Sequence, residues 1–150
     1  MFPAPPAHHP DDTPATATTL RPEHHVGLLD RLIGNAAEVD AAEMQEEFAR
    51  VLATDERVER AYVLIRDAML FTNRRLILVD KQGMTGSKVE YHSLPYRAIT
   101  HFSIETAGHF DLDADLKIWV SGRAEPFTQQ FKRGLSIYAV QSVLAGYACR

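Results

Sequence analysis

The sequence contains a single cysteine, Cys149, so no disulfide can form within the chain. It has no apolar run that approaches the roughly 20 residues needed to span a bilayer, and its N-terminus lacks the basic and then apolar order of a secretory signal. These absences predict a cytoplasmic protein. With 150 residues, 45% of them hydrophobic, the chain has the composition of one globular domain, which needs neither a disulfide nor a metal ion to hold its core.

An excess of basic residues is also missing. The net charge is −4 and the isoelectric point is about 5.9, and the aromatic residues are scattered, so the sequence does not predict a nucleic-acid-binding protein. No catalytic grouping is visible either. A nucleophile needs an adjacent base and an orienting group, whereas Cys149 lies next to the C-terminus, and Ser136 and Ser142 have no histidine near them in sequence. We therefore expect no enzyme activity and no cofactor.

Proline and histidine are concentrated at the N-terminus. Six of the eight prolines and four of the seven histidines precede residue 26, and few large apolar residues accompany them. Such a segment cannot offset the entropy of ordering its backbone. Residues 1–25 are predicted to be a disordered tail, and the adjacent pairs His8-His9 and His24-His25 are expected to give only adventitious metal binding.

Charge divides the rest of the chain into two parts. Residues 26–56 hold eight acidic residues against two basic ones, whereas residues 57–150 carry a net charge of +4. One hypothesis is that the acidic part docks on the basic part, within one molecule or between subunits. The alternative is that both are simply solvated faces, because exposed ion pairs contribute only about 0–1 kcal/mol each.

Hydrophobic periodicity predicts a pair of helices in residues 26–56. The apolar stripe of the first spans residues 28–33 and ends at Gly34-Asn35. The second, over about 40–53, begins with Asp40 and Glu43 at capping-box spacing. Their apolar stripes are the candidate oligomer interface, and its residues are Leu28, Leu29, Leu32, Ile33, Met44 and Phe48.

After Arg57 the period changes to two, which is typical of β-strands. Seven strands are predicted, at residues 58–65, 69–72, 75–81, 88–93, 99–105, 116–121 and 127–132. A final helix over about 136–148 carries one apolar stripe formed by Ile137, Val140, Leu144 and Tyr147. Seven short antiparallel strands with one amphipathic helix predict a mainly β (α+β) fold, in which a closed barrel over 57–150 is capped by the C-terminal helix.

Several long runs resemble a known family. They are GLLD at 27–30 with GN at 34–35 and EVD at 38–40, FTNRRLILVDKQG at 71–83 after RD at 66–67, TGSKVEYHSLPY at 85–96, and ETAGHFDLDADLKIW at 105–119. Together they resemble the small bacterial pleckstrin-homology (PH) domains, formerly known as a domain of unknown function. The resemblance covers nearly all of residues 24–148, and only the Pro/His-rich tail departs from it.

The resemblance implies a PH-like barrel of seven antiparallel strands in two near-orthogonal sheets, with two N-terminal helices and a C-terminal capping helix. It implies no enzyme. It also implies a homo-oligomer, such as the rings that members of the family resemble, and binding of a protein partner whose identity the fold cannot supply.

Three other patterns were considered as ligand sites, and none of them predicts one. Asp111-x-Asp113-x-Asp115 lacks the glycine and the bidentate glutamate of an EF-hand, so no calcium site is predicted. The loop 83–88 has neither the spacing nor the Lys-Ser/Thr order of a phosphate-binding loop. His92, His101 and His109 stand singly, as structural histidines do.

Basic residues near the predicted hairpins are the remaining candidates for a site. Arg66, Arg74, Arg75, Lys81 and Lys88 could clamp an anionic lipid headgroup. The turn at Arg66-Asp67 is very short, however, so a structural role in bonding loop carbonyls or acids is the alternative. The sequence thus predicts a non-catalytic module that self-associates and binds protein partners, with peripheral binding to anionic lipid as the alternative function.

Overall fold

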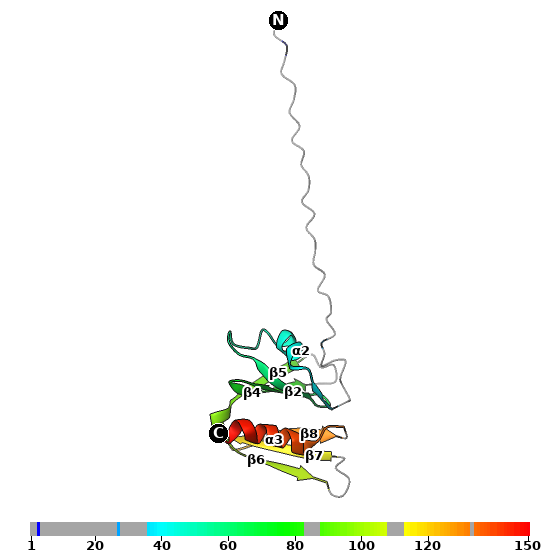
Figure 1. Cartoon of the computed structure of the whole chain (residues 1–150), viewed down its shortest axis with the longest axis vertical. Coiled ribbons are helices and arrows are strands. Elements are labelled where there is room, and N and C mark those ends of the chain that lie inside the picture. The colour runs from blue at the N-terminus through cyan, green and yellow to red at the C-terminus, as the bar shows by residue number, and fades with distance from the viewer. Residues whose placement is uncertain (1–2, 4–26, 28–35, 83–87, 108–112, 133) are drawn as a thin grey trace.

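The computed structural model describes residues 3, 27, 36–82, 88–107, 113–132 and 134–150 (Figure 1). Within them the chain forms eight strands, two α-helices and one short 3₁₀ helix, η1 (Tyr96–Ala98). Neither α-helix in this part of the chain is long and apolar enough to cross a bilayer. Except for Pro3, the predicted tail 1–25 lies outside the described residues, as does the predicted first helix at 28–33.

The first sheet has five antiparallel strands in the order in which they occur along the chain. The connection between the third and fourth strands has only two residues, which places those strands side by side. The turn between the third and fourth strands is held by Asn73, whose Oδ1 accepts the backbone N–H of Arg57 at 2.8 Å. The strands are β1 (Ala37–Val39), β2 (Val58–Val63), β3 (Ala68–Thr72), β4 (Arg75–Gln82) and β5 (Lys88–Pro95).

The second sheet has three antiparallel strands, β6 (Ile99–Thr106), β7 (Asp113–Val120) and β8 (Phe127–Lys132), again in chain order. Its inner face alternates as the sequence predicts: Leu116 and Ile118 on β7 are fully buried, and Phe131 on β8 is nearly so. Figure 1 shows the two sheets as separate layers, with α3 (Ile137–Ala148) beside the second.

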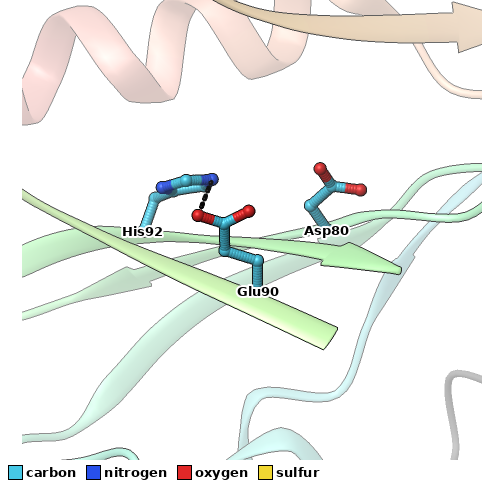
Figure 2. A group of neighbouring side chains, drawn as sticks. All are labelled: Asp80, Glu90 and His92. Atoms are coloured by element: carbon cyan, nitrogen blue, oxygen red, sulfur yellow. Dashed lines mark ion pairs between the residues drawn. The ribbon is translucent and has the colours of Figure 1, made fainter. Parts of the chain in front are cut away.

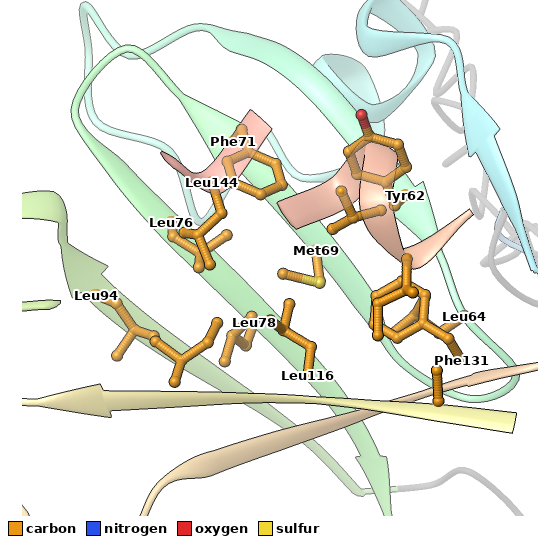
Figure 3. Packing of buried hydrophobic residues seen from close by; sticks show 14 residues of the cluster. Tyr62, Leu64, Met69, Phe71, Leu76, Leu78, Leu94, Leu116, Phe131 and Leu144 are labelled. Carbon is orange, nitrogen blue, oxygen red and sulfur yellow. The ribbon is translucent and has the colours of Figure 1, made fainter. Parts of the chain in front are cut away.

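The main core fills the space between the sheets. Met69, Phe71 and Leu78 project from the first sheet toward Leu116 of the second and Leu144 of α3, and all five are fully buried (Figure 3). Burial of apolar surface stabilises a fold by roughly 25 cal/mol for each Å² removed from water, and this cluster is the larger of the two apolar cores of the described residues.

A second core lies on the opposite face of the first sheet, under α2 (Ala41–Glu47). Met44 and Phe48 pack there on Ala61, Leu70 and Ile77. β3 is therefore buried along its whole length, which explains why its sequence is apolar at nearly every position instead of alternating.

Both helices begin where the sequence predicts. Asp40 caps α2, since its carboxylate accepts the backbone N–H groups of Ala42 at 2.7 Å and Glu43 at 3.2 Å. Ser136 caps α3 by accepting the N–H of Ala139. The predicted stripe of α3 is confirmed, because Ile137, Val140 and Leu144 are buried and Tyr147 packs against the same core.

The predicted second helix, 40–53, is too long. α2 ends at Glu47, and the chain continues to Leu52 through turns that keep Val51 and Leu52 against the second core. After Glu47 the backbone changes to bonds between residues three apart, from the N–H of Ala49 to Glu46 at 3.3 Å and from the N–H of Val51 to Phe48 at 2.8 Å, so the α-helical pattern does not continue.

Two further expectations are corrected. The described residues form eight strands, not seven, because Ala37–Val39 adds to the edge of β2 with Glu38 opposite Tyr62. The closed barrel of the prediction is also wrong: within the described part of the chain no strand of the first sheet pairs with a strand of the second, so the two sheets pack face to face with open edges. β1 was not predicted because its three residues contain only one large apolar side chain, which is too little to show a strand pattern.

Candidate functional site

A cavity of about 640 Å³ opens where the β2–β3 turn meets the far end of β4 and the outer face of β8. The turn is tight, since the backbone N–H of Leu64 donates to the carbonyl of Asp67 at 2.7 Å. The lining is almost entirely polar and carries both charge signs. It comprises Ile65, Arg66, Asp67, Asp80, Lys81, Gln82, Thr128, Gln130 and Lys132.

The acidic side of this cavity is a pair of neighbouring carboxyl groups. Burial, together with the nearby Asp80, raises the pKa of Asp67 to about 6, because these effects outweigh the backbone N–H of Lys81 that bonds to the carboxylate. Two carboxylates brought together in a partly desolvated place resist ionising at once. This part of the cavity therefore favours a positive group.

Asp80 also belongs to a group of three potential metal ligands (Figure 2). Asp80 on β4 stands directly opposite Glu90 on β5, and His92 follows two residues along the same face of β5. One donor atom from each lies within 4.8 Å of the others. Gln82 Nε2 donates to both carboxylates, to Asp80 Oδ2 at 3.3 Å and to Glu90 Oε2 at 3.0 Å.

The predicted anion-binding residues are divided between the two ends of the first sheet. Arg66 and Lys81 line the cavity, and Lys88 begins β5 opposite Gln82 at the same end. Arg74 and Arg75 lie at the other end, at the β3–β4 turn and the start of β4. The five residues thus do not form one site.

Arg74 and Arg75 are bound to acidic residues of the 36–56 segment. Arg75 forms two hydrogen bonds to Glu56, from Nε to Oε1 at 2.8 Å and from Nη2 to Oε2 at 2.9 Å. Arg74 faces Asp55 at 3.9 Å. Arg75 also donates to the carbonyl of Val51 at 2.8 Å, so it bonds to both an acid and a loop carbonyl.

Glu56 is 2% exposed and completely surrounded by donors. Besides Arg75, it accepts the hydroxyl of Thr72 at 2.7 Å and the N–H of Ala53 at 2.9 Å. Burial alone would raise the pKa of Glu56, but the hydrogen bonds from Arg75, Ala53 and Thr72 outweigh it and lower the pKa to about 2. This network joins the 48–56 segment to the β3–β4 hairpin.

The candidate interface residues that the structure describes are buried in the core of the protein. Met44 is fully buried and Phe48 is 4% exposed, both against the first sheet. Leu28, Leu29, Leu32 and Ile33 lie outside the described residues. The exposed large apolar side chains of the described part are Tyr91 on β5 and Tyr138 on α3.

Other residues that the sequence singled out have ordinary surroundings. Asp113 and Asp115 lie in β7, whereas Asp111 and the loop 83–87 lie outside the described residues, as does His109. The ring of His101 stacks on Trp119 with centroids 4.3 Å apart. Cys149 is exposed at the end of α3.

Comparison with known proteins shows the family. The family model for the bacterial PH domain matches residues 27–148. The chain belongs to the bacterial PH domain family. This PH domain is 54% identical over 121 residues to the uncharacterized protein YjqA of Bacillus subtilis, an alignment that covers 80% of this chain and 97% of YjqA.

Two solved structures from Shewanella resemble this PH domain. A DUF1696 family protein with a pleckstrin-homology domain from Shewanella loihica is 50% identical, with a TM-score of 0.66, over 77% of this chain and 98% of the other. A pleckstrin homology domain from Shewanella amazonensis is 48% identical, with a TM-score of 0.68, over 74% of this chain and all of the other. The predicted family is thus confirmed, whereas these relatives' names do not state a ligand.

The sequence did not predict the Asp80–Glu90–His92 group or the place of Lys132 in the cavity. Glu90 and His92 alternate on one predicted strand, which places them on one face. Asp80 joins them only through the β4–β5 register, and Lys132 reaches the cavity only because the two sheets pack together. A hairpin model extended across the 82–88 connection would have found the first group, but no local signal points to Lys132.

Proposed function

We propose that this PH domain is a non-catalytic interaction module that self-associates and binds protein partners through the free edge of β6. The observation that carries this proposal is the open border of the second sheet. β6 has eight residues and pairs with β7 on one side only within the described part of the chain, and it lies at the lower border of that sheet in Figure 1.

The composition of β6 distinguishes it from the other sheet borders. Natural proteins protect edge strands by making them short or by placing lysine or proline in them. β1 has three residues, β5 begins with Lys88 and ends with Pro95, and β8 ends with Lys132. β6 contains neither lysine nor proline and offers a long edge for strand addition.

The direction of the backbone identifies the amides that would pair. Ala107, immediately after β6, donates its N–H to Asp113 at 3.2 Å, so its N–H points toward the β7 side. Successive residues of an antiparallel strand point their N–H groups to opposite sides. The amides of Phe102, Ile104 and Thr106 therefore face the free edge, whereas those of Ser103 and Glu105 face β7.

The non-catalytic part of the proposal rests on the surroundings of the nucleophilic side chains considered from the sequence. Ser136 is used as a helix cap, and Cys149 is exposed at the end of α3. Cys149 lines a cavity of about 270 Å³ together with His101, but the His101 ring stacks on Trp119 and its Nδ1 bonds to the hydroxyl of Thr100. The match to the bacterial PH domain family also supports the non-catalytic part of the proposal.

Native mass spectrometry combined with hydrogen exchange tests the self-association. We expect an oligomer at micromolar concentration and slower exchange at Phe102, Ile104 and Thr106 on going from dilute monomer to oligomer. The amides of Ser103 and Glu105 serve as internal controls, because β7 already protects them. A chain that stays monomeric, or an oligomer whose β6 edge amides exchange as fast as in the monomer, would contradict the proposal.

Peripheral binding of anionic lipid is the second candidate, because Arg66, Lys81 and Lys132 line one cavity. Asp67 and Asp80 in the same cavity oppose an anion, which is why this function ranks second. If lipid binds there, the double variant Arg66→Glu, Lys132→Glu should lose at least tenfold in co-sedimentation with phosphatidylglycerol vesicles at low salt. Arg74→Glu, at the other end of the sheet, is the control. Equal losses in both, or no sedimentation of the wild type, would exclude this site.

A further inference from the structure

We propose that Asp80, Glu90 and His92 bind a divalent first-row transition metal ion, of which Zn²⁺ is the representative. This assignment is independent of the interaction function proposed above. The three side chains come from two adjacent strands and converge on the side of the first sheet that faces the second (Figure 2). One imidazole nitrogen and two carboxylate oxygens would form an open three-ligand site, with water completing the coordination.

The donor atoms are close to the spacing that such an ion requires. With bonds of about 2.1 Å to a tetrahedral ion, two donors stand about 3.4 Å apart. His92 Nε2 and Glu90 Oε1 are 3.7 Å apart, and all three donor atoms lie within 4.8 Å. Glu90 is exposed and can rotate, so a small side-chain movement closes the site.

The surrounding residues hold the ligands as outer-shell groups do in metal sites. Gln82 Nε2 bridges the two carboxylates and keeps them facing the same point. The ring of His92 packs against that of Phe127 on β8, with centroids 4.8 Å apart. The metal ligands are thus oriented by groups that do not themselves coordinate.

Electrostatics favours a cation at this point. Asp80 and Glu90 are directly opposite each other in the β4–β5 ladder, and like charges in that position destabilise a sheet. Asp67 adds a third carboxyl group beside Asp80. A divalent ion between the two ladder carboxylates would replace their repulsion by attraction.

The ligand types select the class of ion. Imidazole suits zinc, copper, iron and nickel, whereas Ca²⁺ and Mg²⁺ take oxygen ligands. A site with one histidine and two carboxylates therefore favours a transition metal ion over the alkaline-earth ions. Ca²⁺, which takes six to eight oxygens, would find only part of its shell here.

The test uses the full chain in which His8, His9, His24 and His25 are replaced by glutamine, so that the N-terminal histidines cannot bind metal. Zn²⁺ is titrated by calorimetry, and the melting temperature is followed with and without the ion. We expect one Zn²⁺ per chain and a higher melting temperature, because binding to the folded state stabilises it.

Variants identify the ligands. His92→Gln and Glu90→Gln should each weaken Zn²⁺ binding at least tenfold, whereas His101→Gln, which alters a histidine stacked on Trp119, should leave it unchanged. Glu90→Gln changes an exposed side chain, so its effect cannot be attributed to loss of the fold. Absence of saturable Zn²⁺ binding, unchanged binding in Glu90→Gln and His92→Gln, or an equal effect of Ca²⁺ or Mg²⁺ would each overturn the proposal.

Discussion

At the residue scale, the buried carboxylate of Glu56 is the most demanding feature of the molecule. An unpaired charge in that position would be prohibitively costly, so Glu56 depends on the bidentate Arg75 and on the Thr72 and Ala53 donors. The network continues to Tyr96, which donates its hydroxyl hydrogen to the carbonyl of Thr72 at 2.6 Å.

Glu56→Gln should lower the free energy of unfolding by about 3–5 kcal/mol at pH 7, because it leaves the Arg75 guanidinium without its anionic partner. Urea denaturation measures the change. The matched control is Glu38→Gln, which removes an ion pair to Arg60 whose two side chains are about half exposed. The control should cost no more than about 1 kcal/mol. Similar losses in both variants would show that the Glu56 network stabilises the fold no more than an exposed ion pair does.

The same network gives a pH dependence with a defined sign. The pKa of Glu56 is about 2 in the folded chain against 4.5 ordinarily, so the unfolded state binds the proton first as the pH falls. The stabilisation from Glu56 is complete above about pH 5 and is lost progressively toward pH 2. Glu56→Gln should therefore show a smaller loss of stability over that range than the wild type.

At the element scale, α3 connects the two sheets. Its buried stripe fills the main core, while Tyr147 packs on Phe71 at 5.6 Å and stacks on Tyr96 at 4.9 Å between ring centroids. Tyr147 also donates a hydrogen bond to Glu59 on β2. The helix therefore contributes far more through tertiary packing than through its own propensity.

Leu144→Ala should lower the free energy of unfolding by about 2–5 kcal/mol, since it opens a cavity in a fully buried place. The control on the same helix is Tyr138→Ala, whose side chain is 53% exposed. It should change stability by about 0.5 kcal/mol or less. Thermal denaturation of both variants measures the difference, and comparable losses would mean that α3 does not close the core.

At the scale of the whole molecule, the division of charge has a structural counterpart. The ion pairs Glu38–Arg60, Asp55–Arg74 and Glu56–Arg75 each join the acidic 26–56 part to the basic part of the chain. Only the last contains a fully buried side chain, that of Glu56. The complementarity seen in the sequence thus operates within one chain, and its exposed members contribute little.

The sequence by itself determined the seven long strands within a few residues, the caps at Asp40 and Ser136, and the stripe of α3. These features depend on local rules: strand and helix periods, turn residues and short-range hydrogen bonds. The family resemblance pointed to the same arrangement, apart from the number of strands and the closure of the barrel.

Only the tertiary structure decided the remaining features. It added β1, left the two sheets unjoined and bonded Arg75 to Glu56. It also brought Asp80 beside Glu90 and His92. Each of these results depends on residues far apart in the sequence, whose meeting is set by strand register and sheet packing, and periodicity carries no information about either.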